Sequence, residues 1–227
     1  MSFLVKVFQL SIYWPIYLFL KLIFKLEVEG IDNLKEIENK NAIFASNHAH
    51  WLDPVIGGYS LPRQFLLPYK YSPLYFICAK EYFNFFKSPV PFPISLIVAL
   101  YVRINGSVPV DRDNKLPLEE KLKEAIKVLK LGHKLWIFPE GKISKDGTLQ
   151  KGKRGVGFLH KATGVPIVPV ALVNTFQCTN IKNLIQFILG KKRIKVVFGK
   201  PLYNLQNLEI EEIVNKVMKE IENLILK

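Results

Sequence analysis

The sequence predicts an α/β fold with a mostly parallel or mixed central sheet covered by helices. Two observations point to this fold class. Short runs of β-branched and aromatic residues are bounded by turn residues, which is typical of buried strands. Segments with apolar residues at helical spacing lie between these runs, and this alternation favours helices packed on a sheet. The predicted strands are NAIFAS (41–46), KLWIFP (134–139), PIVPVAL (166–172) and IKVVFG (194–199).

Three segments predict helices. In LPLEEKLKEAIKVLKLG (116–132) four apolar residues form one stripe, and Gly132 is a stop signal. VGFLHKATG (156–164) predicts a short helix. The C-terminal segment 210–225 repeats apolar residues at helical spacing, so a longer helix is expected there.

The segment 61–101 is rich in Pro and aromatic residues and is too apolar for an ordinary loop. Its composition suits a membrane-facing or substrate-covering excursion and a core segment equally well. Within it, SLIVALYV (95–102) is compatible with a strand or a helix.

The N-terminal residues are strongly apolar and aromatic. Between Lys6 and Lys21 the chain runs 14 residues without a charge, whereas a spanning helix needs about 20 mostly apolar residues. Pro15 would kink such a helix. We therefore expect residues 1–25 to form a membrane-associating helical segment that enters the membrane without a full span, followed by one domain over residues 26–227. A spanning helix and an ordinary core helix are the alternatives.

The composition indicates an anionic partner. The chain has 227 residues and a formal net charge of +13. Such a charge suits a membrane surface, a phosphate-bearing substrate, an acidic carrier protein or nucleic acid. The aromatic residues lie mostly in apolar runs, which does not favour a base-stacking nucleic-acid groove. The two cysteines, Cys78 and Cys178, are far apart and lie in no Cys/His cluster, which argues against a disulfide framework or a zinc site.

The stretch NHAHWLDP (47–54) carries two of the four histidines. Pro54 favours the first helical position, so Asp53 is expected to be an N-cap. In the simplest interpretation Asp53 only caps this helix, His48 is a satisfied polar residue and Trp51 packs. In the alternative, His48 lies in the turn before the helix, and Asp53 sets its tautomer and basicity for proton transfer. A metal site has little support, because no third ligand accompanies His48 and His50 at a suitable spacing.

A second group of polar residues follows the predicted strand 134–139. In FPEGKISKDG (138–147) the turn lies where α/β proteins usually bind ligands, although an ordinary turn has the same composition. Glu140 adds a carboxylate, and Gly141 would let backbone N–H groups approach an anion. Four basic residues near turns are either solvated surface charges or parts of an anion site: Lys80, Arg112, Lys153 and Arg154.

The order of these pieces resembles the glycerolipid acyltransferase family, whose best-known members are bacterial 1-acylglycerol-3-phosphate acyltransferases. Four blocks occur in the family's order over roughly residues 25–200, after a matching lead-in, VEGIDNL (28–34). The blocks are His48-x4-Asp53, VPVDR (108–112), FPEG (138–141) and VPIVPV (165–170).

The resemblance implies a fold of the predicted kind and a direct acyl transfer. His48 would act as general base on a free hydroxyl of the acceptor, and Asp53 would orient it. The donor would be the acyl thioester of coenzyme A or acyl carrier protein, and no cofactor or metal is needed. Lys80 and Arg112 would hold the acceptor phosphate, with Lys153 and Arg154 as weaker candidates. Glu140 and Gly141 would line the acceptor pocket.

The expected reaction converts 1-acylglycerol-3-phosphate (lysophosphatidate) to phosphatidate at the cytoplasmic face of the cell membrane. The protein is expected to be peripheral or monotopic on an anionic membrane surface, and nucleic acid is not expected as a partner.

One departure from the family pattern concerns the acceptor. The family usually has Thr and Arg after FPEG, whereas this sequence has Lys142 and Ile143. Lys142 supplies a charge but not a bidentate fork, so another lyso-lipid or glycerol-3-phosphate is an alternative acceptor. A thioesterase and a non-catalytic basic lipid-binding protein are the alternatives outside this reaction.

Overall fold

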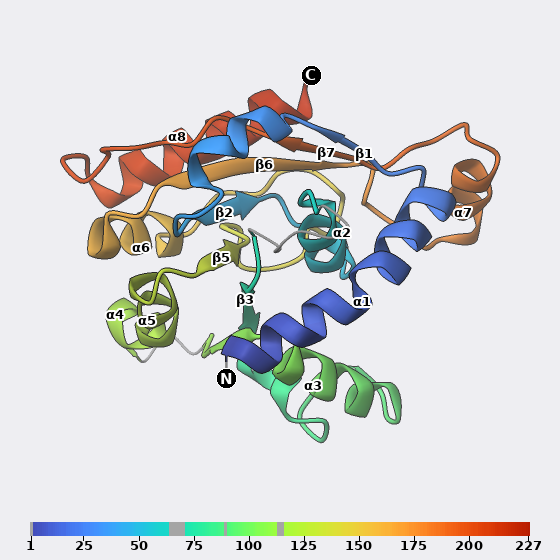
Figure 1. The fold of residues 1–227 in the computed structure, drawn as a ribbon, viewed down its shortest axis with the longest axis horizontal. Coiled ribbons are helices and arrows are strands. Elements are labelled where there is room, and N and C mark those ends of the chain that lie inside the picture. The colour runs from blue at the N-terminus through green and yellow to red at the C-terminus, as the bar shows by residue number, and fades with distance from the viewer. Residues whose placement is uncertain (1, 64–70, 89, 113–115) are drawn as a thin grey trace.

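The protein folds around one seven-stranded sheet (Figure 1). The computed structural model describes residues 2–63, 71–88, 90–112 and 116–227. The strand order is β1-β7-β6-β2-β5-β3-β4, and every neighbouring pair is parallel except β6 and β7. This confirms the prediction of a mostly parallel or mixed sheet. The strands are β1 (Glu27–Glu29), β2 (Ile43–Ser46), β3 (Leu74–Ala79), β4 (Ser107–Val110), β5 (Lys134–Ile137), β6 (Ile167–Val173) and β7 (Lys195–Phe198).

The four predicted strands are β2, β5, β6 and β7, and the structure adds β1, β3 and β4. In segment 61–101, for which the sequence predicted no single structure, residues 64–70 and 89 lie outside the described residues. The rest contributes β3, which is a core strand, and a helix over SLIVALYV. The helices are α1 (Ser2–Ile23), α2 (Asp53–Ser60), α3 (Ile94–Ile104), α4 (Leu118–Lys121), α5 (Lys123–Lys130), α6 (Gly155–Thr163), α7 (Ile181–Ile188) and α8 (Ile210–Ile225), with 3-10 turns η1 (Ile31–Ile37) and η2 (Lys80–Phe83).

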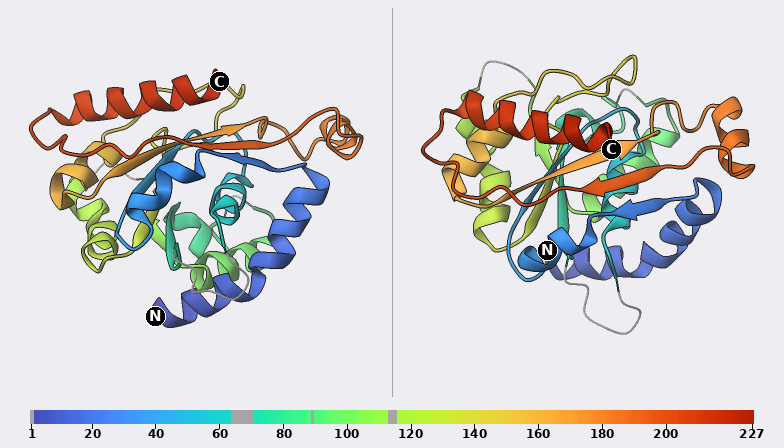
Figure 2. Two further views of the ribbon diagram at one scale, coloured as in Figure 1. Left: turned by 45° about the horizontal axis from the view of Figure 1, so that its top comes forward. Right: turned by 90° about the horizontal axis from the view of Figure 1, so that it is seen from above.

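The core lies on both faces of the sheet. Alternate strand residues face opposite sides, so Leu135 and Ile137 pack beneath α5, α6 and α8, while Trp136 packs on the side of α1 and α2. Figures 1 and 2 show these two helical layers enclosing the strands. Trp136 is fully buried, stacks on Phe44 at 5.3 Å between ring centroids, and donates to Ser46 Oγ at 2.9 Å. The indole hydrogen bond satisfies the polar atom that burial would otherwise leave unpaired.

The N-terminal helix α1 lies along the body of the protein and continues through Pro15. One side is buried. On that side Gln9 donates to the backbone oxygens of Leu74 and Asn105, and the Tyr13 hydroxyl donates to the Leu61 oxygen. The opposite side is an exposed apolar face that comprises Phe3, Leu4, Val7, Leu18, Phe19 and Leu22. Among the described residues, α1 is the one helix that is long and apolar enough to cross a membrane.

Gly57 on α2 is required by the close approach of Trp136, because an added Cβ would lie 2.5 Å from the indole ring. We expect Gly57→Ala to lower the free energy of unfolding by about 1–3 kcal/mol, since the enclosed indole must shift. Gly155→Ala is the matched control: a Cβ there meets nothing nearer than 3.5 Å, so stability should change by roughly 0.5 kcal/mol or less. Urea denaturation measures both. Equal losses in the two variants would contradict this account.

Candidate active site

The candidate site lies at one edge of the sheet, where the parallel strands β2, β3, β4 and β5 all end. This edge is the usual ligand-binding edge of α/β sheets. His48 follows β2 and Glu140 follows β5. Lys80 follows β3 and Arg112 follows β4. The topology therefore brings four separate sequence blocks to one end of the sheet.

His48 and Asp53 form a hydrogen-bonded pair. His48 Nδ1 lies 2.9 Å from Asp53 Oδ2, and Asp53 is fully buried. The same carboxylate oxygen accepts the backbone N–H groups of Ala49 and His50, each at 2.7 Å. Three donors on one oxygen hold the turn before α2 in place and fix the imidazole with Nδ1 toward the carboxylate. Nε2 makes no hydrogen bond to any described residue, and the His48 side chain is 14% exposed.

Two expectations for this stretch were wrong. Asp53 does not act as an N-cap: α2 begins at Asp53, and its carboxylate accepts hydrogen bonds from the turn that precedes the helix. Trp51 does not pack in the core, because it is 63% exposed beside the site. Asp53 Oδ2 faces the preceding turn because it pairs with His48 there. From that position it cannot accept the N–H groups of the first helical turn, as an N-cap would.

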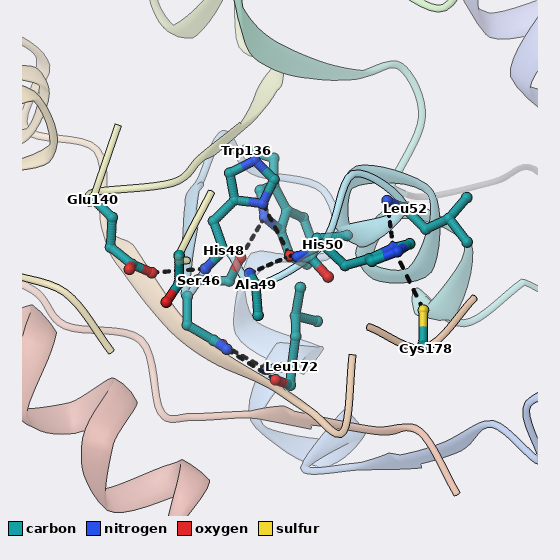
Figure 3. Close-up of polar contacts among 12 residues, drawn as sticks. Ser46, His48, Ala49, His50, Leu52, Trp136, Glu140, Leu172 and Cys178 are labelled. Atoms are coloured by element: carbon teal, nitrogen blue, oxygen red, sulfur yellow. Dashed lines mark hydrogen bonds and ion pairs between the residues drawn. The ribbon is translucent and has the colours of Figure 1, made fainter. Parts of the chain in front are cut away.

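The loop after β5 holds the His48 backbone on both sides. Glu140 Oε1 accepts the His48 N–H at 2.7 Å (Figure 3). The Ser144 N–H donates to the His48 oxygen at 2.7 Å. The other Glu140 oxygen accepts the Gln150 N–H at 2.9 Å. Burial raises the pKa of Glu140, although these two backbone hydrogen bonds oppose that change. Both Glu140 oxygens thus face backbone groups of this chain.

Phe138 forms the floor of the site. Its ring stacks on the His48 imidazole with 3.9 Å between centroids and an angle of 19°. Phe138 and Ser144 were missed as individual site residues, although both lie in the quoted FPEGKISKDG stretch. His48 follows β2 and Phe138 follows β5, so the contact between their rings depends on how these strands pair. Spacing along the chain therefore does not predict it.

His50 plays a structural part next to His48. Its Nδ1 accepts the Leu52 N–H at 3.2 Å and lies 3.4 Å from Cys178 Sγ, while Nε2 lies 3.1 Å from Thr179 Oγ1. Burial lowers the pKa of His50 and so favours the neutral ring. In the described part of the chain, no three His, Cys, Asp or Glu residues are grouped to hold a metal ion.

The basic candidates differ in their surroundings. Lys80 Nζ lies 3.8 Å from Asp111 Oδ2, and Arg112 is exposed at the end of β4. Lys153 lies over Gly141, because a Cβ on that glycine would meet the lysine side chain at 3.0 Å. Gly141 has a φ of +69°, which favours glycine.

Two further basic residues lie at the rim of the same loop. Arg154 pairs with Glu211 of α8 at 2.9 Å, so its guanidinium is engaged away from the loop after β5. Lys142 is exposed and directly follows the Gly141 turn.

The chain is similar to known acyltransferases. A family model described as Acyltransferase matches residues 25–173. The chain is 26% identical over 199 residues to the chloroplast 1-acyl-sn-glycerol-3-phosphate acyltransferase BAT2 of Brassica napus, covering 87% of this chain and 51% of that protein. It is 27% identical over 191 residues to the 1-acyl-sn-glycerol-3-phosphate acyltransferase of Bacillus subtilis, covering 80% and 81%.

The chain spans about half the length of the plant relatives it matches. Among solved structures, the 1-acyl-sn-glycerophosphate acyltransferase PlsC of Thermotoga maritima superposes with a TM-score of 0.63 at 20% identity, over 96% of this chain and 80% of that one. This likeness concerns the fold and supports the same sheet architecture. The matched region contains the His48–Asp53 pair, the Arg112 block and the Glu140 turn, and the chain belongs to the acyltransferase family.

Proposed function

We propose that this protein is a membrane-associated O-acyltransferase that moves an acyl chain from an acyl thioester to the free hydroxyl of 1-acylglycerol-3-phosphate, giving phosphatidate. The observation that carries the proposal is the His48–Asp53 pair at the ligand-binding edge of the sheet, with Nε2 left for a substrate. The names of the curated relatives support the choice of acceptor.

His48 is the general base. Its Nδ1–H donates to Asp53, so Nε2 carries the lone pair that takes the hydroxyl proton. As the acceptor oxygen bonds to the thioester carbonyl carbon, the proton moves to Nε2. The carbon–sulfur bond then breaks, and the imidazolium returns the proton to the departing thiolate. Asp53 stabilises the transient imidazolium. Neither an acyl-enzyme nor a cofactor is required, and the thioester of coenzyme A or acyl carrier protein is the co-substrate.

The acceptor phosphate is bound by cations at the same edge. Arg112 and Lys80 follow β4 and β3, which lie beyond β5 on one side of β2, the strand that precedes the base. Lys142 and Lys153, which lies over Gly141, offer charge in the loop after β5, the strand between β2 and β3. Arg154 contributes less, because Glu211 already engages it. Lys142 and Lys153 together stand in for the Arg that the family usually has after FPEG.

The exposed apolar face of α1 supports a location at a bilayer, where the proposed lipid acceptor would reside. The buried side of α1 is tied to the body through Gln9 and Tyr13, so the helix is held along the protein surface. That arrangement favours a helix lying in the membrane interface over one that leaves the domain to span the bilayer. The cytoplasmic face is proposed because the acyl donors are formed there.

His48→Ala should lower acyl transfer to lysophosphatidate by about 10²–10⁴-fold, because the general base is lost. Asp53→Asn should lower it similarly by releasing the imidazole. The assay uses a labelled acyl thioester with lysophosphatidate, glycerol-3-phosphate and zwitterionic lyso-lipids in detergent. His133→Ala, at the opposite edge of the sheet, is the matched control and should retain activity.

Other outcomes of that assay would replace the proposal. Full activity in His48→Ala would remove the proposed base. Release of free fatty acid in place of a diacyl product would indicate a thioesterase. Vesicle binding without transfer to any acceptor would indicate a non-catalytic lipid binder. Transfer to a different lyso-lipid alone would keep the chemistry and change the acceptor.

Arg112→Ala should raise the KM for the phosphate-bearing acceptor by on the order of tenfold, with a smaller change in the KM for the acyl donor. The physical reason is the loss of a charge-assisted hydrogen bond to the phosphate. Arg154→Ala should change the acceptor KM much less, because its guanidinium pairs with Glu211. Equal effects of Arg112→Ala on both substrates would remove its role in phosphate binding.

Glu140→Gln should mainly lower kcat, by roughly 10–100-fold, with little change in the acceptor KM. The Glu140 carboxylate accepts the backbone N–H groups of His48 and Gln150. In the variant, the NH₂ group of the amide would face one of these N–H groups, the hydrogen bond there would be lost, and His48 would shift. Asp146→Asn, an exposed carboxylate in the same loop, is the control. A raised acceptor KM with unchanged kcat would instead indicate that Glu140 touches the acceptor.

A further inference from the structure

Helix α7 presents apolar side chains to solvent. Ile181, Ile185, Ile188 and Leu189 are between 50% and 67% exposed. At helical spacing these residues fall within one arc of the helix surface, so they form a continuous apolar stripe. We call Ile181, Ile185, Ile188 and Leu189 the α7 stripe.

The α7 stripe is not needed to hold the helix in the fold. A different side of the helix does so: Phe187 is fully buried, and its ring packs edge-on against Phe24 at 5.4 Å between centroids. Leu184 packs against the same core, and the Asn180 side chain caps the helix start by accepting the Lys182 N–H at 3.1 Å. Since folding leaves the stripe uncovered, its apolar character requires another explanation.

The surroundings of the stripe are basic. Lys182 and Lys191 are exposed at the two ends of the helix. Lys192 lies over the Phe187 ring, and Arg193 pairs with Glu27. Residues 147–208, which include α7 and its flanks, contain no Asp or Glu. An apolar stripe rimmed by lysines is complementary to an anionic lipid surface, where the apolar side chains reach the acyl boundary and the ammonium groups meet phosphates.

The α7 stripe belongs to a helix that is a neighbour of α1. Helix α7 packs against α1, and the Phe24–Phe187 contact lies at the C-terminal end of α1. Both views in Figure 2, like Figure 1, place α7 beside that end of α1. The adjoining turns of α1 expose Leu18, Phe19 and Leu22.

We propose that α7 is a second membrane-binding element, which inserts its stripe into the interface of an anionic bilayer alongside α1. The inference rests on the proposed membrane location of α1. Two helices with a buried aromatic contact between them would fix how the protein sits on the bilayer, and so how the His48 edge of the sheet faces the lipid. A single helix would leave the protein free to rock about its axis.

The test measures binding of the full-length protein to vesicles by flotation. One set of vesicles is pure phosphatidylcholine, and the other also contains phosphatidylglycerol. Ile185→Ser with Ile188→Ser should weaken binding to both sets by about tenfold. Leu131→Ser with Leu226→Ser is the control for exposed apolar residues elsewhere and should bind like the unaltered protein.

A second pair of variants tests the charges. Lys182→Gln with Lys191→Gln should weaken binding roughly 5-fold per lysine on the phosphatidylglycerol vesicles only. Lys216→Gln with Lys219→Gln, exposed on α8, should not. Acyl transfer in detergent micelles should stay unchanged in all four variants, which shows that they fold.

Three outcomes would overturn the inference, and they are distinguishable. If the unaltered protein floats with vesicles and the α7 variants float equally well, α7 is not a membrane contact, while the proposed location of α1 stands. If the unaltered protein binds no vesicle, both fail. Loss of affinity for acyl carrier protein in the α7 variants, with vesicle binding intact, would assign the stripe to an acidic protein partner.

Discussion

The hydrogen bonds to one oxygen of Asp53 are the interaction on which the candidate site depends. A buried carboxylate is costly unless it is paired, and here one oxygen takes two backbone N–H groups and the His48 imidazole. The same contacts shape the turn before α2 and orient the His48 imidazole, the proposed base. Removal of the Asp53 charge would therefore disturb both the turn and the imidazole.

A second buried carboxylate, Glu140, connects this turn to the neighbouring strand. Because β2 and β5 are adjacent and parallel, the loops that follow them meet at the same edge of the sheet. Glu140 and Ser144 then bind the two sides of the His48 peptide, and Phe138 supports its ring. The His48 backbone is thus held by a residue 92 positions further along the chain, while Asp53 and Phe138 contact its imidazole.

The exposed apolar surfaces of α1 and α7 are a second feature of the molecule. In each helix, one side carries aromatic residues into the core and another leaves apolar residues in solvent. Such surfaces fit the proposal of an enzyme that meets a lipid acceptor at a bilayer in a defined orientation.

The sequence by itself determined the fold class, four of the strands, the helices of residues 156–164 and 210–225, and the family. It also predicted one helical segment over residues 116–132, which the structure divides into α4 and α5 at Leu122. Apolar periodicity and turn residues are local signals, and the ordered blocks of the family survive in a single chain. The sequence left two roles open for Asp53, a helix cap and a partner of His48, and the structure shows the pairing with His48. Tertiary structure alone decided that Glu140 binds the His48 backbone, that Trp51 is exposed, and that α7 turns its stripe outward. The Glu140 contact joins residues 92 apart and depends on β2 and β5 becoming neighbours, which local spacing along a chain does not encode.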